Sequence, residues 1–226
     1  MYQSRDKQGL CYPTNIISMN KPPEYITGTY RFLERDFFID ERAYIPNKET
    51  EILTTYAISL IKPEQTILDI GVGSGNIAIS LSLAQPACKI YGIDVSPEAL
   101  EVAVKNVDLH NVTNVTLMKS RYVDDIDISS PDLIIADLPW GDEEHILETS
   151  NHEYHPYLPK IALFHPEGIL SAYLELIESI QRKHWKTTLL FESGTISKEE
   201  IASEMPKDLE WEYIPFPKYS ITKVVF

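Results

Sequence analysis

The sequence predicts an α/β fold: a doubly wound, mostly parallel seven-stranded sheet with an antiparallel last strand, preceded by a small N-terminal β-hairpin. Two observations predict it. From residue 66 onward, short and almost continuously apolar runs alternate with helical runs, which is typical of a parallel sheet covered on both faces. The last two apolar runs, residues 211–216 and 221–226, have no helix between them and therefore indicate an antiparallel pair at one edge.

The N-terminal part is predicted to be separate from this sheet. Residues 1–22 have no clear periodicity and predict a loosely ordered arm. Aromatic and β-branched residues are enriched in 25–32 and 34–40, on either side of a short polar turn, and this pattern indicates a hairpin. We therefore expect two parts: an arm with the hairpin over residues 1–47, and one α/β domain over residues 48–226.

The elements of the α/β domain follow in order. Apolar positions within residues 52–61 predict an amphipathic helix that Pro63 stops. The five strands predicted to be parallel are residues 66–70, 89–93, 115–118, 132–136 and 187–192. Ser96, Pro97 and Glu98 together signal a helix start, with serine as the N-cap and proline at the first position. The remaining helices are expected at residues 77–84, 97–109, 168–183 and 197–205.

Composition narrows the class of protein. The 226 residues hold 34 acidic and 20 basic side chains, for a formal charge of −14. A protein whose main partner is a phosphate backbone needs a basic face, so nucleic acid is not an expected partner. The two cysteines provide neither a disulfide framework nor a zinc pattern, and we expect a cytoplasmic protein. No apolar run resembles a signal peptide or reaches the ~18 residues of a membrane span.

A glycine-rich turn lies between the first parallel strand and its helix. Residues 69–75 read D-I-G-V-G-S-G, and Asp94 ends the next strand. Glycines permit a tight turn and close approach of a ligand, while the helix N-terminus offers unpaired N–H groups. The spacing differs from the dinucleotide fingerprint G-x-G-x-x-G, but an acid after the second strand is placed to bind ribose hydroxyls. The alternative is a turn whose glycines serve packing alone.

A second candidate motif, Asp137-Leu138-Pro139-Trp140, directly follows the fourth strand. Ligands bind at the carboxyl ends of strands in open α/β sheets, so this turn should face the same cleft as Asp94. The Asp137 carboxylate and the Leu138 carbonyl can each accept an N–H bond, which would aim the lone pair of one nitrogen at an electrophile. Trp140 could stack on a planar group. The alternative reading makes Asp137 a helix N-cap and Trp140 a core residue.

The D-x-G-x-G-x-G run with an acid one strand later resembles the class I methyltransferases that use S-adenosyl-L-methionine (SAM), which have a Rossmann-like fold. In that family the glycine loop passes the methionine part of SAM and the acid holds the ribose. The resemblance thus implies a cofactor site at Asp69, Gly71, Gly73, Gly75, Asp94, Val95, Ser120 and Arg121. Ser120 and Arg121 stand where the family has an acid near the adenine, and Asp124 or Asp125 is an alternative for that acid.

The acceptor motif resembles the (D/N)-P-P-(Y/F/W) signature of amino-group methyltransferases. Further similarity over residues 22–226 is to the HemK/PrmC family, whose members methylate a glutamine side-chain amide in peptide release factors. The segments that carry this likeness are 23–28, 37–42, 45–51, 159–163, Gly168, Tyr173, 191–194 and 222–225. The family's I-P-R-P-E-T-E run reads I-P-N-K-E-T-E here.

Two departures bear on the substrate. The family's N-P-P-Y begins with Asn, whereas this chain has Asp137, and an ionised Asp only accepts hydrogen bonds. Asp suits an amine or guanidine better than an amide. The family also carries an N-terminal helical domain that engages the release factor, and only about 20 residues precede the hairpin here, too few for a helical bundle.

The predicted function is therefore SAM-dependent methyl transfer to an amide, amine or guanidine nitrogen of a small-molecule or amino-acid-like substrate. The predicted catalytic residues are Asp137, Leu138, Pro139 and Trp140. Two alternatives stay open: methylation of a protein glutamine, and an inactive SAM-binding protein that regulates another enzyme.

Four histidines surround the loop after the acceptor motif, namely His145, His152, His155 and His165. Their spacing does not match a metal-binding pattern, so we expect no metal. One of them, or Tyr154, could line the acceptor pocket.

Overall fold

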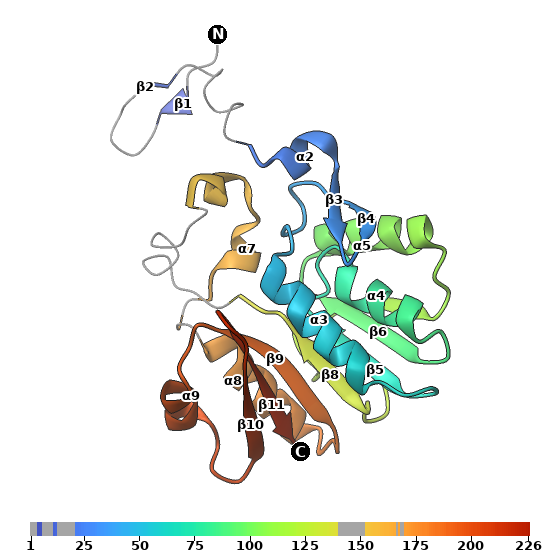
Figure 1. Cartoon of the computed structure of the whole chain (residues 1–226), viewed down its shortest axis with the longest axis vertical. Coiled ribbons are helices and arrows are strands. Elements are labelled where there is room, and N and C mark those ends of the chain that lie inside the picture. Colours follow the sequence, from blue (N-terminus) through green and yellow to red (C-terminus); the bar gives the residue numbers. More distant parts are fainter. Residues whose placement is uncertain (1–3, 6–10, 13–20, 140–151, 166, 168–169) are drawn as a thin grey trace.

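A seven-stranded sheet forms the centre of the protein in the computed structural model (Figure 1). The structure describes residues 4–5, 11–12, 21–139, 152–165, 167 and 170–226. The strand order is β10-β11-β9-β8-β5-β6-β7. The strands are β5 (Thr66–Ile70), β6 (Lys89–Asp94), β7 (Val115–Lys119), β8 (Leu133–Ala136), β9 (Thr188–Gly194), β10 (Glu210–Pro215) and β11 (Ser220–Val225).

The pairing confirms the predicted fold class. β5 runs parallel to both β6 and β8, and the parallel pairing extends to β7 on one side and to β9 on the other. β11 lies between β9 and β10 and is antiparallel to both. The last strand therefore fills an interior position of the sheet and β10 forms the edge.

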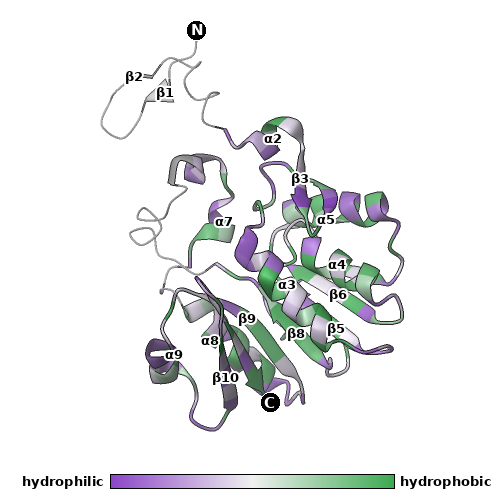
Figure 2. Cartoon of the chain, in the orientation of Figure 1, coloured by the Kyte–Doolittle hydropathy of each residue, from purple (hydrophilic) through white to green (hydrophobic). Residues whose placement is uncertain are grey.

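Helices cover the two faces of the sheet. α3 (Lys48–Leu60), α4 (Asn76–Ala84) and α5 (Pro97–His110) pack on one face, and α8 (Ser171–Arg182) and α9 (Lys198–Glu204) pack on the other. Each face has its own buried cluster of apolar side chains. Figure 2 shows hydrophobic residues along β5 and β8 and mixed faces on α3 and α5, as burial of one helix face requires.

Helix caps explain several boundaries. Ser96 and Ser197 both act as N-caps, as predicted for Ser96, and Ser197 forms a capping box with Glu200. α3 begins earlier than the apolar pattern predicts, because Asn47 accepts a hydrogen bond from the Thr50 N–H and caps the helix. The structure also contains two short elements that the sequence did not predict, a 3₁₀ helix at His152–Tyr157 and α7 (Lys160–Leu163).

The N-terminal hairpin is shorter than predicted. β3 (Thr29–Phe32) pairs with β4 (Arg35–Phe38). Residues 25–27, which were predicted to begin the first strand, instead belong to a short helix, α2 (Pro23–Thr27). Pro23 suits the first helical turn, and Gly28 ends the helix in a left-handed conformation with φ 72°. The arm before it contains a two-residue antiparallel pair, β1 (Ser4–Arg5) with β2 (Cys11–Tyr12).

The hairpin packs on α4 and α5 through a third buried cluster, which includes Phe37, Ile79 and Val102. Asn106 of α5 is fully buried; its side chain accepts the Phe38 N–H at 2.7 Å and donates to the Phe38 carbonyl at 2.9 Å. This packing carries the segment after the hairpin, residues 42–46, to the carboxyl ends of the strands. The predicted division at residue 47 stays a prediction.

Candidate active site

The glycine loop joins β5 to α4 at the carboxyl end of the sheet. Gly71 and Gly73 have φ of 78° and 53°, in the left-handed region that other residues rarely adopt. A Cβ at Gly71 would lie 3.0 Å from Leu138 Cδ2 and 3.2 Å from the Asp137 carbonyl oxygen. Glycine is therefore required for the loop to pack directly against the predicted acceptor turn.

Asp94 links this loop to the start of α5. One carboxylate oxygen accepts the Gly73 N–H at 2.9 Å and the other accepts the Ser96 N–H at 2.8 Å. Burial raises the pKa of Asp94 above its ordinary value, although these backbone bonds oppose the shift. Each oxygen can accept a further hydrogen bond, so Asp94 has the capacity to bind a pair of hydroxyls.

Asp69 lies behind the loop and does not line the cleft. It is fully buried, and one carboxyl oxygen accepts the Ala78 N–H at 3.0 Å, while Oδ1 has no hydrogen-bond partner among the described residues. Burial raises its pKa to about 8. Asp69 thus ties the first turn of α4 to β5, and its predicted contact with a cofactor stays a prediction.

The acceptor turn begins with Asp137, immediately after β8. Its Oδ2 accepts the Thr50 hydroxyl of α3 at 2.6 Å, and its carboxyl group also shares a hydrogen bond with the carboxyl group of Glu192. Burial raises the pKa of Asp137. The side chain is thereby held between α3 and β9, and in the described residues it does not cap a helix N-terminus.

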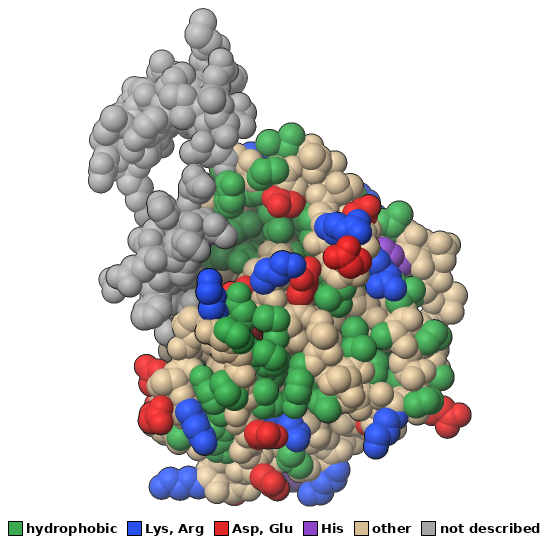
Figure 3. All heavy atoms as spheres, in the orientation of Figure 1, with side chains coloured by type: hydrophobic (Ala, Val, Ile, Leu, Met, Phe, Trp, Pro, Cys, Tyr) green, Lys and Arg blue, Asp and Glu red, His purple; other side chains and the backbone are tan. Residues whose placement is uncertain are grey.

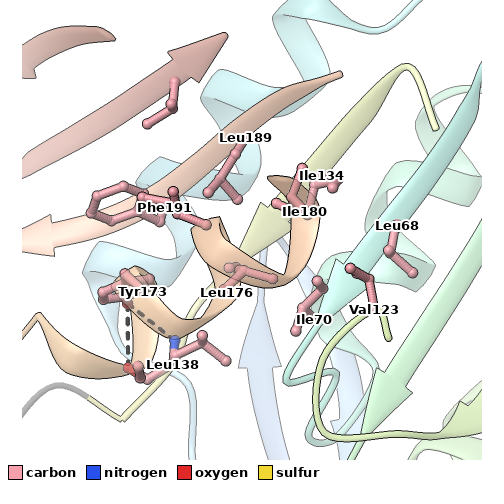
Figure 4. Close-up of a cluster of buried hydrophobic side chains, with 14 of the residues drawn as sticks. Leu68, Ile70, Val123, Ile134, Leu138, Tyr173, Leu176, Ile180, Leu189 and Phe191 are labelled. Atoms are coloured by element: carbon pink, nitrogen blue, oxygen red, sulfur yellow. Dashed lines mark hydrogen bonds between the residues drawn. The ribbon is translucent and has the colours of Figure 1, made fainter. Parts of the chain in front are cut away.

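The second residue of the turn is held from α8. The Leu138 N–H donates to the Tyr173 hydroxyl at 3.1 Å, and that hydroxyl donates to the Leu138 carbonyl at 3.3 Å (Figure 4). The Tyr173 ring stacks on Phe191 with centroids 4.4 Å apart. The carbonyl keeps one lone pair, so it can still accept from a bound nitrogen. Trp140 lies outside the described residues, and its predicted stacking role stays a prediction.

A cleft of about 340 Å³ joins the loop to the turn. Of the predicted site residues, those that line it are Gly71, Gly73, Asp94, Val95, Arg121, Asp137, Leu138 and Pro139. Gly75 and Ser120 do not: Gly75 caps α4, and buried Ser120 donates its hydroxyl to the Tyr122 carbonyl. Two motifs separated by more than sixty residues in the sequence therefore share one cavity.

The far end of the cleft carries an ion pair. Arg121 bonds Glu175 of α8 at 2.8 Å. Neither Asp124 nor Asp125, the alternatives for an acid near the adenine, lines the cleft. Asp124 instead binds Arg182 and Ser179, and the Arg182 hydrogen bond lowers its pKa to about 2.

Sequence reasoning missed several residues of the site. Arg42 and Tyr44 reach the cleft from the segment between the hairpin and α3, Thr50 reaches it from α3 itself, and Phe164 reaches it from the segment after α7. The resemblance to the I-P-R-P-E-T-E run was the signal for Thr50. Glu192, behind Asp137, was also missed. The signal that could have found it is an acidic residue near the end of a buried strand.

Among the histidines whose side chains the structure describes, His165 reaches the cleft. It is 7% exposed, lines the cavity and has Nε2 3.4 Å from a Glu175 carboxylate oxygen. Tyr154 and His155 do not line it, while His145 and the side chain of His152 lie outside what the structure describes. Within the part of the chain that the structure describes, no group of three or more His, Cys, Asp or Glu could hold a metal ion, and no helix is long and apolar enough to cross a bilayer.

Comparison with known proteins finds similarity to methyltransferases. A family model described as a methyltransferase domain matches residues 61–200. The chain is 34% identical over 164 residues to a release factor glutamine methyltransferase of Chlorobaculum tepidum, covering 66% of this chain and 54% of that protein. It is also 34% identical over 165 residues to the protein of that name from Lactococcus lactis, covering 72% and 59%. The chain thus spans little more than half the length of these relatives.

Solved structures show the same fold at low identity. A ribosomal protein L11 methylase from Lactobacillus delbrueckii has a TM-score of 0.56 and 18% identity, covering 82% of each chain. A Streptococcus mutans protein solved in complex with SAH has a TM-score of 0.53 and 14% identity, covering 80% of this chain and 99% of that one.

Proposed function

The chain belongs to the methyltransferase domain family, and from this premise we propose that it is a SAM-dependent N-methyltransferase of HemK/PrmC type. One observation carries the proposal: a single cleft is lined both by the glycine loop with Asp94 and by the Asp137-Leu138-Pro139 turn. A cofactor and an acceptor nitrogen can therefore meet there. The relatives named as glutamine methyltransferases support transfer to nitrogen.

The residues present fit SAM. Asp94 offers two carboxylate oxygens for ribose hydroxyls, and Val95 is 39% exposed beside it for contact with a base. A Cβ at Gly73 would meet nothing nearer than the Gly71 carbonyl at 3.8 Å, so the room beside this loop belongs to the cleft. Bound SAM supplies an electrophilic methyl group.

The chain's own contribution is positioning. The Asp137 carboxylate and the Leu138 carbonyl accept N–H bonds from the acceptor, which orients the nitrogen lone pair into the cleft. Thr50 and Tyr173 hold these two acceptors in place. A neutral nitrogen held this way loses its surplus proton after transfer, so that step needs no strong base. An amine or guanidine that binds in its protonated form first gives up one proton, to water or to the Asp137 carboxylate, which exposes the lone pair.

We propose a small-molecule or amino-acid-like acceptor, with an amine or guanidine favoured by the carboxylate at position 137. Figure 3 shows Lys and Arg side chains standing among acidic and hydrophobic ones on the visible face, without a continuous basic surface there, in keeping with the charge of −14. The second candidate, a protein glutamine, is favoured by the names of the relatives. We place the reaction in the cytoplasm, because two cysteines in 226 residues provide no disulfide framework of the kind found in secreted proteins.

Calorimetric titration with SAM tests the cofactor, and we expect saturable binding of one molecule per chain. A mass-spectrometric screen then compares amines, guanidines and free amides with a release factor. Methylation of an amine or guanidine alone supports the proposal, whereas methylation of the release factor alone supports the second candidate. Absence of SAM binding contradicts both. Binding of SAM without turnover on any acceptor indicates an inactive regulatory protein.

A further inference from the structure

A second carboxyl group stands behind the acceptor turn. Ala136 pairs with Phe191 in the parallel register of β8 and β9, so the next residues, Asp137 and Glu192, occupy neighbouring positions. Neighbouring positions on adjacent strands direct their side chains to the same face of the sheet. The two carboxyl groups accordingly meet in a side-chain hydrogen bond.

This hydrogen bond requires a proton. An ionised carboxylate only accepts, so two ionised carboxylates cannot bond each other. Glu192 is 8% exposed, and among the described residues no Lys or Arg forms a hydrogen bond or ion pair with either carboxyl group. Two adjacent charges without a counter-ion are strongly disfavoured away from water, so the pair holds one proton between them.

The partners of each carboxyl group decide where the proton resides. Asp137 Oδ2 accepts the Thr50 hydroxyl at 2.6 Å, and a donated hydrogen bond stabilises the ionised form. Glu192 Oε2 is buried and has no partner among the described residues, so nothing there stabilises a charge. Burial, and then the charge of Asp137, raise the pKa of Glu192 well above its ordinary value.

The groups that face the pair from other elements act in the same direction. Glu49 of α3 is a further acid whose charge raises the pKa of both carboxyl groups. Tyr44 and Tyr173 are phenols whose pKa burial raises, so they are neutral and offset no charge. Asp69 lies close enough for the charge of Asp137 to raise its pKa. No neighbour named here favours a second negative charge.

We infer that Glu192 is a positioning residue that stays protonated and donates its O–H to Asp137, so that the acceptor turn carries one negative charge. Asp137 is then held by two donors, Thr50 from α3 and Glu192 from β9, and keeps its remaining lone pairs for the cleft. Only this last consequence, the orientation of an acceptor N–H, rests on the proposed function. At alkaline pH the loss of the Glu192 proton would bring two carboxylates into contact and destabilise the turn.

Infrared spectroscopy of the protein alone tests the proton directly. We expect the carbonyl band of a neutral carboxylic acid at neutral pH, lost in Glu192→Gln and shifted in heavy water. Glu210→Gln, at an exposed position of β10, is the matched control and leaves the band unchanged. Because Asp69 is also protonated near neutral pH, Asp69→Asn identifies its separate band. A Glu192→Gln difference spectrum that contains only ionised carboxylate overturns the inference.

The pH dependence of unfolding gives a second readout. The unfolding free energy of the wild type falls as pH rises above neutral. In Glu192→Gln this fall is smaller by the contribution of one titrating proton, because Gln does not titrate. Gln also still donates a hydrogen bond to Asp137. Glu192→Ala, without a donor, is less stable than Glu192→Gln. If Glu192→Gln does not fold, Asp137→Asn replaces it, and removal of the charge weakens the neutral-acid band. Equal pH dependence in folded wild type and Glu192→Gln overturns the inference.

Neither measurement uses SAM or an acceptor. Failure of the SAM titration would therefore overturn the proposed function alone, and the protonation of Glu192 would still be decided by the infrared spectra.

Discussion

Three aspartates near the ends of neighbouring strands have different surroundings and therefore different capacities. Asp94 lines the cleft with both oxygens bonded to backbone N–H groups, Asp69 is sealed beneath the loop, and Asp137 lies between a hydroxyl and a second carboxyl group. The residue type alone does not distinguish the three aspartates. The surroundings separate the structural support given by Asp69 from the proposed cofactor binding of Asp94 and the proposed acceptor positioning of Asp137.

Asp137→Ala tests the acceptor role. We expect turnover to fall on the order of 10²–10³-fold, because one oriented hydrogen-bonding group at the reacting atom is lost. SAM affinity should change less than about twofold, since Asp137 acts on the acceptor. Calorimetry and turnover of the acceptor found by the screen provide the two measurements. Asp94→Ala is the control, and we expect it to weaken SAM binding. A large loss of SAM affinity in Asp137→Ala would contradict the acceptor role of Asp137.

Asp69→Asn tests the buried acid through pH. The native pKa of about 8 exceeds the ordinary value, so the native state holds a proton that the unfolded chain has lost between these values. Stability therefore falls as pH rises toward 8, by at most ~1.4 kcal/mol per pH unit from this group. The Asn variant should lose this part of the slope in urea unfolding between about pH 5 and about pH 9. Asp108→Asn, at an exposed position of α5, should keep the full slope.

At the scale of elements, the site is made by the loops that follow the parallel strands. β5, β6, β7 and β8 each deliver a segment to the cleft, and the glycine loop touches the acceptor turn directly at Gly71. This contact couples the proposed cofactor side of the cleft to the proposed acceptor side. A change at one loop should therefore be felt at the other.

Gly71→Ala tests this contact. The added Cβ would press on the Asp137 carbonyl at 3.2 Å, which is backbone and cannot move without the turn. We expect a loss of roughly 2–4 kcal/mol from the left-handed backbone and the overlap together. Gly28→Ala is the matched control: its φ is 72°, but a Cβ there meets nothing within 4 Å, so backbone strain alone of about 1–2 kcal/mol is expected. Equal losses in urea unfolding would argue against a close contact at Gly71.

At the scale of the whole molecule, the hairpin and the α/β sheet are joined beside the cleft. Asn106 is the common point, because its amide also donates to the Ser74 carbonyl of the glycine loop at 2.8 Å. The Tyr30 hydroxyl adds a hydrogen bond to the Ser74 hydroxyl at 2.8 Å. The hairpin thus supports the glycine loop, and the segment after the hairpin lines the cleft.

Asn106→Ala should destabilise both the hairpin and the glycine loop. Three backbone groups, one buried and two partly buried, lose their partner, so we expect a loss of roughly 2–4 kcal/mol in unfolding free energy. Amide hydrogen exchange should quicken in β3, β4 and the glycine loop. Asn114→Ala removes a hydrogen bond from the residue just before β7 to the Cys88 carbonyl, away from the hairpin, and it should leave exchange in the hairpin unchanged. Unchanged hairpin exchange in Asn106→Ala would contradict the support role.

The sequence predicted most of the elements for a physical reason. Parallel strands buried on both faces are nearly continuous apolar runs, and serine caps mark helix starts, so local patterns contain this information. The start of the hairpin was predicted wrongly, because residues 25–27 are β-prone by composition while Pro23 and Gly28 enclose one helical turn.

Runs of neighbouring residues were enough to predict the seven-stranded fold, the glycine loop and the turn at Asp137-Leu138-Pro139, because each of these depends on local sequence. Only the tertiary structure decided that Asp69 is sealed away, that Thr50 and Tyr173 hold the turn, and that Glu192 meets Asp137. These facts depend on strand register and helix packing, which bring together residues 35 to 87 positions apart. Contacts over such distances are set by how the helices and strands pack, and a local pattern does not record them.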